Sequence, residues 1–316
     1  MTAVLRPVVE TDLDALERMA AHASPGLGSL RLDRAGLEAR IRASQQAFAT
    51  PDEEVSGEER YLFALEIEGR VCGCSGIAAS AGFGTSFYSY RNEFVVALSP
   101  ALRLRTRTHT LHLGHDLTGA TLLTSFYIEP EAARWQDGAA AQLLSRGRLA
   151  FLHRHAQRFA ERVAAEFPGW LDAAGGSPFW DAVGRRFFDM DYGQAELLAT
   201  GRNKTFLADL MPQSPIYVPL LPEDAQRAIG QLHPDAELPF DILQSEGFDT
   251  DTHVDIMDGG PIAEARLVSL RSLRTPAPLS CARIAANAQV EGFRAWLAAP
   301  GEVLPRGSLA LRLELE

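Results

Sequence analysis

The sequence predicts an α+β protein built from two related halves, of which the second is shorter. The chain has 316 residues, which exceeds the usual size of a single domain. Short apolar runs typical of strands alternate with helical patterns along its first part. Residues 179–188 and 240–248 both begin with an aromatic residue and contain a glycine before a closing phenylalanine, like two equivalent helix endings. We therefore expect domains at residues 1–195 and 196–316, with two unrelated amphipathic helices as the alternative reading of these endings.

The first domain is expected to open with a strand, two helices and a hairpin. Thr11 or Asp12 is placed to cap the first helix, and Asp33 opens a second helical pattern after a Pro-Gly breaker. Glu68 and Gly69 separate two apolar runs and predict a hairpin turn. The expected elements are a strand at 4–9, helices ending near 22 and starting at 33, and strands at 61–67 and 71–77.

The remaining segments alternate strand and helix. An apolar run at 122–128 predicts a strand, and the helical pattern at 138–159 is followed by a second short strand at 163–167. Another helix is expected at 178–188. From Gly259 onward apolar and polar residues alternate between prolines, which predicts peripheral strands and loops.

Charge and hydropathy exclude several classes of protein. The formal net charge of −11 disfavours nonspecific binding to nucleic acid or to an anionic membrane, because the overall field repels phosphate. The N-terminus has neither the basic start nor the apolar run of a signal peptide, and no stretch approaches the ~20 apolar residues of a membrane span. We expect a cytoplasmic protein.

Cysteine and histidine spacing does not predict a metal site. Cys72, Cys74 and Cys281 are too few for a disulfide framework, and we expect buried thiols. His109 and His112 precede His115 at intervals of three in an expected strand and loop, which is not a convincing ligand set. We therefore expect no metal.

Four long motifs resemble the arginine N-succinyltransferase family, which belongs to the GNAT superfamily of acyltransferases. They are SPFWDAVGRRFFDMD at 177–191, ADLMP at 208–212, IGQLHP at 229–234 and DIMDGGP at 255–261. The resemblance implies two GNAT-like domains, the second abbreviated, and transfer of succinyl from succinyl-CoA to the α-amine of arginine, or of ornithine in some members. This reaction opens a catabolic route for arginine. Residues 123–128 and 216–222 resemble the α-type subunit that some bacteria pair with a β-type sister.

The resemblance also implies a binding site for the acyl donor. GNAT proteins hold the CoA pyrophosphate with backbone N–H groups at the start of a helix, where amides lack partners. Gly138 and Ala140 match the end of that loop pattern, whereas Trp135 stands where a basic or amide residue is usual. The strand from Phe126 to Ile128 should splay and offer a backbone N–H to the thioester oxygen.

Proton transfer and substrate recognition are expected from residues elsewhere in the chain. The family assigns the proton-donor role to the histidine that matches His233, and imidazole titrates near neutral pH. A loop histidine that caps backbone is the alternative. Arg91 is expected to bind the distal carboxylate of succinyl. His115 and Asp116 are the next substrate-binding candidates. The open candidates for the cationic acceptor are Asp116, Glu166, Asp255 and Asp258.

Two other functions remain open from the sequence. The chain could be a GNAT acyltransferase for another acyl-CoA or amine, or a non-catalytic subunit that assembles with a β-type sister. The departure at Trp135 favours the second alternative. We expect either a homodimer or a heteromer with that sister, with succinyl-CoA and arginine or ornithine as small-molecule partners.

Overall fold

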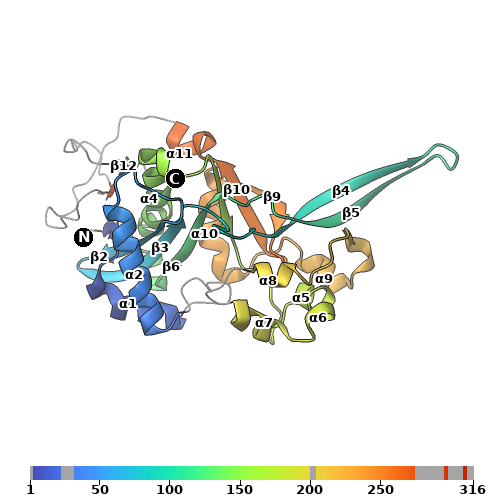
Figure 1. The fold of residues 1–316 in the computed structure, drawn as a ribbon, viewed down its shortest axis with the longest axis horizontal. Coiled ribbons are helices and arrows are strands. Elements are labelled where there is room, and N and C mark those ends of the chain that lie inside the picture. The colour runs from blue at the N-terminus through green and yellow to red at the C-terminus, as the bar shows by residue number, and fades with distance from the viewer. Residues whose placement is uncertain (1–2, 23–31, 200–203, 275–294, 298–308, 312–316) are drawn as a thin grey trace.

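The computed structural model describes residues 3–22, 32–199, 204–274, 295–297 and 309–311 (Figure 1). Within these ranges twelve strands form one sheet in the order β12-β11-β1-β2-β3-β6-β7-β10-β9-β4-β5-β8. Its neighbouring strands are antiparallel except for the pairs β6–β7 and β11–β12. Helices cover both faces, so the α+β prediction is confirmed at this level.

The N-terminal part forms the expected strand, helices and hairpin. The strands are β1 (Ala3–Pro7), β2 (Arg60–Ile67) and β3 (Arg70–Ala78), and the helices are α1 (Leu13–His22) and α2 (Arg34–Ala49). Asp33 caps α2 by accepting a hydrogen bond from the backbone N–H of Gly36. Glu68 and Gly69 form the hairpin turn with φ angles of 51° and 82°. Side chains of α1 and α2 pack on one face of this hairpin.

The opposite face is covered by α4 (Ala139–Arg154) and α10 (Glu237–Ser245). Alternate residues of β2 face the two layers, with Phe63 directed to the α4 layer and Leu62 to the α1–α2 layer. Aromatic rings of Tyr61, Phe63 and Phe151 pack with centroids 5.1 to 5.5 Å apart. The sheet therefore has a core on each side, and its middle strands are buried on both faces.

Two adjacent strands separate in the middle of the sheet. β6 (Thr121–Ile128) and β7 (Arg162–Glu166) run parallel and pair only at Thr121 with Val163 and at Leu122 with Ala164. Beyond that point β6 continues along β3, while β7 continues along β10 (Pro261–Arg266). The splay expected for the strand at 122–128 is present, and it opens the sheet toward the carboxyl ends of β6 and β7.

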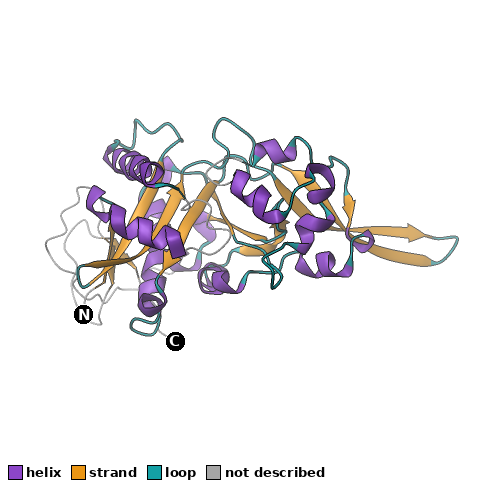
Figure 2. Cartoon of the chain, turned by 90° about the horizontal axis from the view of Figure 1, so that it is seen from below, coloured by secondary structure: helices purple, strands orange, loops and turns teal. Residues whose placement is uncertain are grey.

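A long two-stranded ribbon projects from the end of the molecule opposite the N-terminus (Figures 1 and 2). It is formed by β4 (Ser89–Ser99) and β5 (Leu104–Gly114), which pair along their whole length. Only its base joins the sheet, through β9 (Asp249–Val254) on one side and β8 (Ile216–Tyr217) on the other. We call residues 94–109 of this ribbon the arm.

A second hydrophobic core lies beside the base of the ribbon and contains Tyr90, Trp180 and Ile256. Short helices of the central part of the chain contribute to it. They are α5 (Pro178–Ala182), α6 (Arg185–Phe188), α7 (Tyr192–Ala199), α8 (Thr205–Ala208) and α9 (Glu223–Ala228), while α3 (Pro130–Ala133) precedes α4 and α11 (Arg271–Arg274) follows β10.

The prediction of one continuous helix at 178–188 is wrong. The structure has α5 and α6 with a break at Val183 and Gly184. Gly184 lies against Trp180 so closely that a Cβ there would be 2.3 Å from a ring carbon of the tryptophan. The glycine therefore permits the second short helix to fold back on the first. The helix predicted to reach 159 also ends earlier, at Arg154.

The two-domain expectation is not confirmed. Of the two helix endings that suggested it, only α10 leads into a strand, β9, whereas α6 is followed by another helix. β10 comes from after residue 195 and pairs with β7 from before it, so one sheet includes both parts. β10 lies inside the sheet, and β11 (Ala295–Leu297) and β12 (Leu309–Leu311) lie at its edge. The division at residue 195 stays a prediction.

Candidate active site

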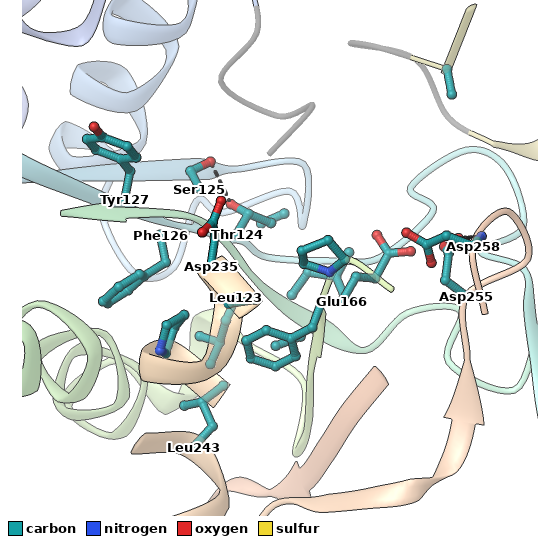
Figure 3. Close-up of a pocket in the computed structure, with 18 of the residues that line it drawn as sticks. Leu123, Thr124, Ser125, Phe126, Tyr127, Glu166, Asp235, Leu243, Asp255 and Asp258 are labelled. Atoms are coloured by element: carbon teal, nitrogen blue, oxygen red, sulfur yellow. Dashed lines mark hydrogen bonds between the residues drawn. The ribbon is translucent and has the colours of Figure 1, made fainter. Parts of the chain in front are cut away.

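A cavity of about 810 Å³ lies where β6 and β7 separate (Figure 3). One wall is β6 from Leu122 to Ile128, and the other begins with the end of β7 at Glu166 and the following Phe167. The size is that of a site for a small-molecule ligand. Both Phe126 and Ile128, the residues expected at the thioester, line this cavity.

The β6 wall contains a β-bulge. Cys74 pairs with Tyr127 and Gly76 with Thr124, so that Ser125 and Phe126 together lie opposite a single residue of β3. Ser125 has a φ of 56°, which is unusual for a residue other than glycine. A bulge redirects backbone groups out of the ladder, and this one lies on the strand that borders the cavity.

The loop before α4 is a tight turn with left-handed backbone conformations. Gln136, Asp137 and Gly138 have consecutive positive φ angles of 45°, 55° and 89°, and Gly138 is the N-cap of α4. The first turn of a helix leaves backbone N–H groups without intrahelical partners. The side chain of Ala140 is fully buried in the core, so this residue can contact a ligand only through its main chain. Gly138 and Ala140 do not line the described cavity.

Three arginines line the cavity near β6. Arg40 of α2 donates a hydrogen bond from Nη2 to Ser125 Oγ at 2.7 Å. Arg148 of α4 approaches β6 from the opposite face and donates to the carbonyl oxygen of Thr124 at 3.3 Å. Arg60 lies at the start of β2. Burial lowers the pKa of Arg40 to about 10 and that of Arg148 to about 9, so both positions disfavour charge in the absence of an anion.

An acidic cluster lines the cavity near β7. It consists of Glu166 at the end of β7 and of Asp255 and Asp258 after β9, and Figure 3 shows the three carboxyl groups close together. Lys204 lies among them, donating to Glu166 at 2.9 Å and also to Asp255. With all groups ionised the cluster carries three negative charges and one positive charge.

The carboxyl groups of this cluster have shifted pKa values. Burial, opposed by Lys204, raises the pKa of Glu166 to about 7. Burial and the neighbouring Asp255 raise the pKa of Asp258 to about 6. Burial also acts on Asp255, but Lys204 outweighs it and keeps the pKa of Asp255 below its usual value. The cluster thus holds excess negative charge in a buried place, which a cationic ligand would relieve.

His233 lies next to the cavity wall but does not line it. It caps the short helix Pro234–Ala236, because its Nδ1 accepts a hydrogen bond from the backbone N–H of Asp235 at 3.2 Å. An accepting Nδ1 leaves the proton of the neutral ring on Nε2. The capping contact considered as an alternative is therefore present, and it also fixes the tautomer.

The other three predicted residues lie outside the lining. Arg91 of β4 donates to Asp116 at 3.2 Å and also contacts Glu93. His115 is exposed, and its ring packs edge-on against Tyr88 at a centroid distance of 6.0 Å. Tyr88 itself lines the cavity. The structure therefore brings Arg91 and Asp116 together outside the cavity, with their side chains 43% and 40% exposed, and packs His115 against one residue of the lining.

Sequence reasoning missed Arg40, Arg148 and Lys204 in the cavity lining. One signal for Arg148 was its place among the leucines and alanines of α4, where almost every side chain is buried. The signal for Lys204 was that it is the only lysine among 30 basic residues. Of the predicted thiols, Cys72 and Cys74 are buried and free, and Cys281 lies outside the described residues.

Among the described residues, no group of three histidine, cysteine, aspartate or glutamate side chains is arranged to hold a metal ion. Within the same ranges, the helices are too short or too polar to cross a membrane.

Comparison with known proteins supports the resemblance noted in the sequence. A family model described as arginine N-succinyltransferase beta subunit matches residues 3–272. The arginine N-succinyltransferase subunit alpha of Pseudomonas aeruginosa is 48% identical over 272 residues, which are 85% of this chain and 79% of the relative. The chain belongs to the arginine N-succinyltransferase family.

The chain is not equally similar to all members of the family. The arginine N-succinyltransferase subunit beta of Pseudomonas aeruginosa is 37% identical over 85% of this chain and 78% of its own length, which is less similar than the alpha subunit. The solved structure of arginine/ornithine succinyltransferase subunit AI from the same species superposes with a TM-score of 0.80 at 42% identity. That match includes 98% of this chain and 92% of the other. The fold is therefore that of this acyltransferase family.

Proposed function

We propose that the protein transfers a succinyl group from succinyl-CoA to the α-amine of arginine or ornithine. One observation carries this proposal: a single cavity, at the splay of β6 and β7, has arginines on one side and excess carboxylates on the other. A succinyl donor brings an anionic end, and arginine brings a cationic one. The family membership supports the same pair of substrates, since relatives are named for this reaction.

The donor is proposed to lie along β6. The pyrophosphate of CoA would bind at the start of α4, where Gly138 has a positive φ and backbone amides are free of helical partners. The thioester would then reach the bulge of β6, where amides at Phe126 to Ile128 can donate to its carbonyl oxygen. Such donors stabilise the negative charge that develops on that oxygen in the transition state.

The acceptor is proposed to bind at the acidic cluster. Glu166 and Asp258 provide negative charge beyond what Lys204 neutralises, and a guanidinium or ammonium side chain supplies the missing positive charge. Anchoring that end leaves the α-amine of the acceptor free to approach the thioester at β6. Both arginine and ornithine satisfy this requirement.

His233 is proposed to act as the acid–base group that transfers the proton. The neutral α-amine attacks the thioester carbonyl carbon, a C–N bond forms, and the C–S bond breaks. Nε2–H of His233 protonates the departing thiolate, and the proton lost by the amine restores the imidazole. The capping bond at Nδ1 supports this role because it holds the ring as the Nε2–H tautomer.

Arg91, His115 and Asp116 are proposed to act on substrate binding indirectly. His115 packs against Tyr88, which lines the cavity, and Arg91 pairs with Asp116, the residue that follows His115. Their substitution should therefore disturb the position of Tyr88 rather than remove a charge from the substrate.

Assembly is proposed to use the arm, either in a homodimer or with a β-type sister. The names of the relatives, subunit alpha and subunit beta, indicate that members of the family associate. The arm exposes six large apolar side chains, and an isolated two-stranded ribbon is marginally stable in water. These side chains are Phe94, Val95, Val96, Leu98, Leu102 and Leu104. A partner that covers them would stabilise the ribbon.

A substrate screen tests the proposed function. Release of CoA thiol is measured with succinyl-CoA or acetyl-CoA, each with arginine, ornithine or lysine as acceptor. We expect release to require both succinyl-CoA and arginine or ornithine. Equal rates with acetyl-CoA, or with no acceptor, would contradict the proposal.

A further inference from the structure

Arg148 is a buried arginine that pairs with none of the carboxylates in the described part of the chain. Its side chain is 2% exposed, and its guanidinium donates only to neutral oxygens. These are the carbonyl oxygen of Ser145 at 3.4 Å, the hydroxyl of Ser145 at 3.3 Å and the carbonyl oxygen of Thr124 at 3.3 Å. Among the residues that the structure describes, no carboxylate forms an ion pair with Arg148.

A neighbouring arginine on the same helix is also buried but has an acidic partner. Arg146 lies two residues earlier on α4 and is also buried, but its Nε is 2.6 Å from the carboxylate of Glu246. Burying an unpaired cation is unfavourable, which is why such groups are normally paired. Burial lowers the pKa of Arg148 to about 9 for the same reason. Arg148 thus lacks an anion that Arg146 has.

The position of Arg148 indicates which anion would pair with its guanidinium. Its guanidinium lies 5.5 Å from the centre of the Phe126 ring and donates a hydrogen bond to Thr124. It therefore contacts the residues on both sides of Ser125 in the bulge. It also lines the cavity near the point where β6 and β7 begin to separate. The thioester is proposed to lie at this bulge. With the thioester there, a carboxylate three carbon–carbon bonds away from the thioester carbon would lie on the side of the bulge that Arg148 contacts.

We propose that Arg148 binds the distal carboxylate of the acyl group and thereby selects a dicarboxylic acyl donor. The inference rests on the proposed function, because it assumes that the acyl-CoA occupies this cavity. It replaces Arg91, which does not line the cavity and is already paired with Asp116, as the anchor of that carboxylate. Arg148 would contact the donor at the end opposite to the bond that breaks.

The test compares two donors that differ only at that end. Succinyl-CoA and butyryl-CoA both carry four acyl carbons, and butyryl has a methyl group in place of the carboxylate. In Arg148→Met, kcat/KM for succinyl-CoA should fall by roughly 10²-fold or more, because a site built for a charged group loses its partner. The kcat/KM for butyryl-CoA should be unchanged or higher. Arg148→Gln, which keeps a hydrogen-bond donor without the charge, should show the same change in donor preference.

Arg146→Met is the matched control. It removes a buried arginine from the same helix, and any loss of stability should lower kcat/KM for both donors by one common factor. An equal fall for both donors in Arg148→Met and Arg148→Gln would overturn the inference and leave the proposed function intact. A wild-type enzyme that transfers succinyl and butyryl equally well would overturn it too. Absence of turnover with every acyl-CoA in the wild type would instead contradict the proposed function itself.

Discussion

Lys204 donates a hydrogen bond to Glu166 at 2.9 Å and bridges it to Asp255. It is the only lysine in the chain, and it lies in the wall of the cavity. One ammonium cannot balance the three carboxylates of the cluster, so negative charge remains for a substrate cation. Burial also makes each charge in this cluster interact more strongly than it would at the surface.

Glu166→Gln should weaken acceptor binding selectively. The substitution removes one charge from the acidic cluster with little change in shape, and Glu166 accepts a hydrogen bond from Lys204. We expect KM for arginine to rise roughly 10-fold to 100-fold, while KM for succinyl-CoA stays the same. Steady-state kinetics with each substrate varied in turn measures this. Glu161→Gln, at an exposed carboxylate paired with Arg266, is the control and should change neither value.

Acceptor binding should depend on pH near neutrality. Burial raises the pKa of Glu166 to about 7, so this carboxyl group is anionic above pH 7 and gains a proton below it. The dissociation constant of arginine, measured by calorimetry, should therefore increase as pH falls from 8 to 6. Glu166→Gln should flatten that dependence. An identical pH dependence in wild type and variant would show that another group controls it.

Gly138→Asp should weaken CoA binding. It places a side chain where φ is 89° and adds negative charge at the start of α4, next to the proposed pyrophosphate site. We expect at least a tenfold higher dissociation constant for CoA by calorimetry. Gly175→Asp is a matched control, since Gly175 has a φ of 79° with open space around it and does not line the cavity. Unchanged CoA affinity in a folded Gly138 variant would exclude this site.

His233→Ala should lower turnover by roughly 10²–10⁴-fold, the range for a positioned acid–base group. CoA affinity should change little, because a proton donor at the reacting centre acts mainly on the transition state. His233→Asn, which can still cap the backbone N–H of Asp235, separates the two roles. If His233→Asn retains more than about half of the wild-type turnover, the histidine is only a cap.

The double variant Val96→Glu and Leu98→Glu should prevent assembly. Both side chains are exposed on one face of the arm, where their cross-strand partners are Arg107 and Arg105. Light scattering coupled to size exclusion, on the chain alone and with a β-type sister, should show loss of the oligomer. Leu197→Glu, at another exposed leucine, should leave the mass unchanged. A wild-type chain that is monomeric both alone and in the presence of the β-type sister would contradict a role for the arm.

Much of the fold around the site could be predicted from local sequence. The apolar run of β6 and the glycine before α4 predicted the strand and helix that border the cavity, because each signal lies within a few residues. The acidic cluster was only a set of open candidates. Glu166 and Asp255 are 89 positions apart, and only the pairing of β7 with β10 brings their segments together.

The arm and the broken helix show what local patterns cannot predict. The sequence predicted only a strand and loop around His109 to His115. Nothing in it indicates that β4 and β5 pair with each other far beyond their contacts with β9 and β8. The break at Gly184 depends on the position of the Trp180 ring, which packs in a core formed by distant segments. Arg148 was missed because its helical position predicts burial, whereas the cavity beside it exists only once β6 and β7 separate.

The most direct test of the account is the reaction of the wild-type chain with succinyl-CoA and arginine. Thiol release is followed together with the mass of the arginine product. We predict arginine-dependent release of CoA and a product that has gained one succinyl group at its α-amine, with ornithine as the other acceptor to be tried. Thiol release that does not depend on the acceptor, or arginine that stays unmodified while succinyl-CoA is present, would contradict the account.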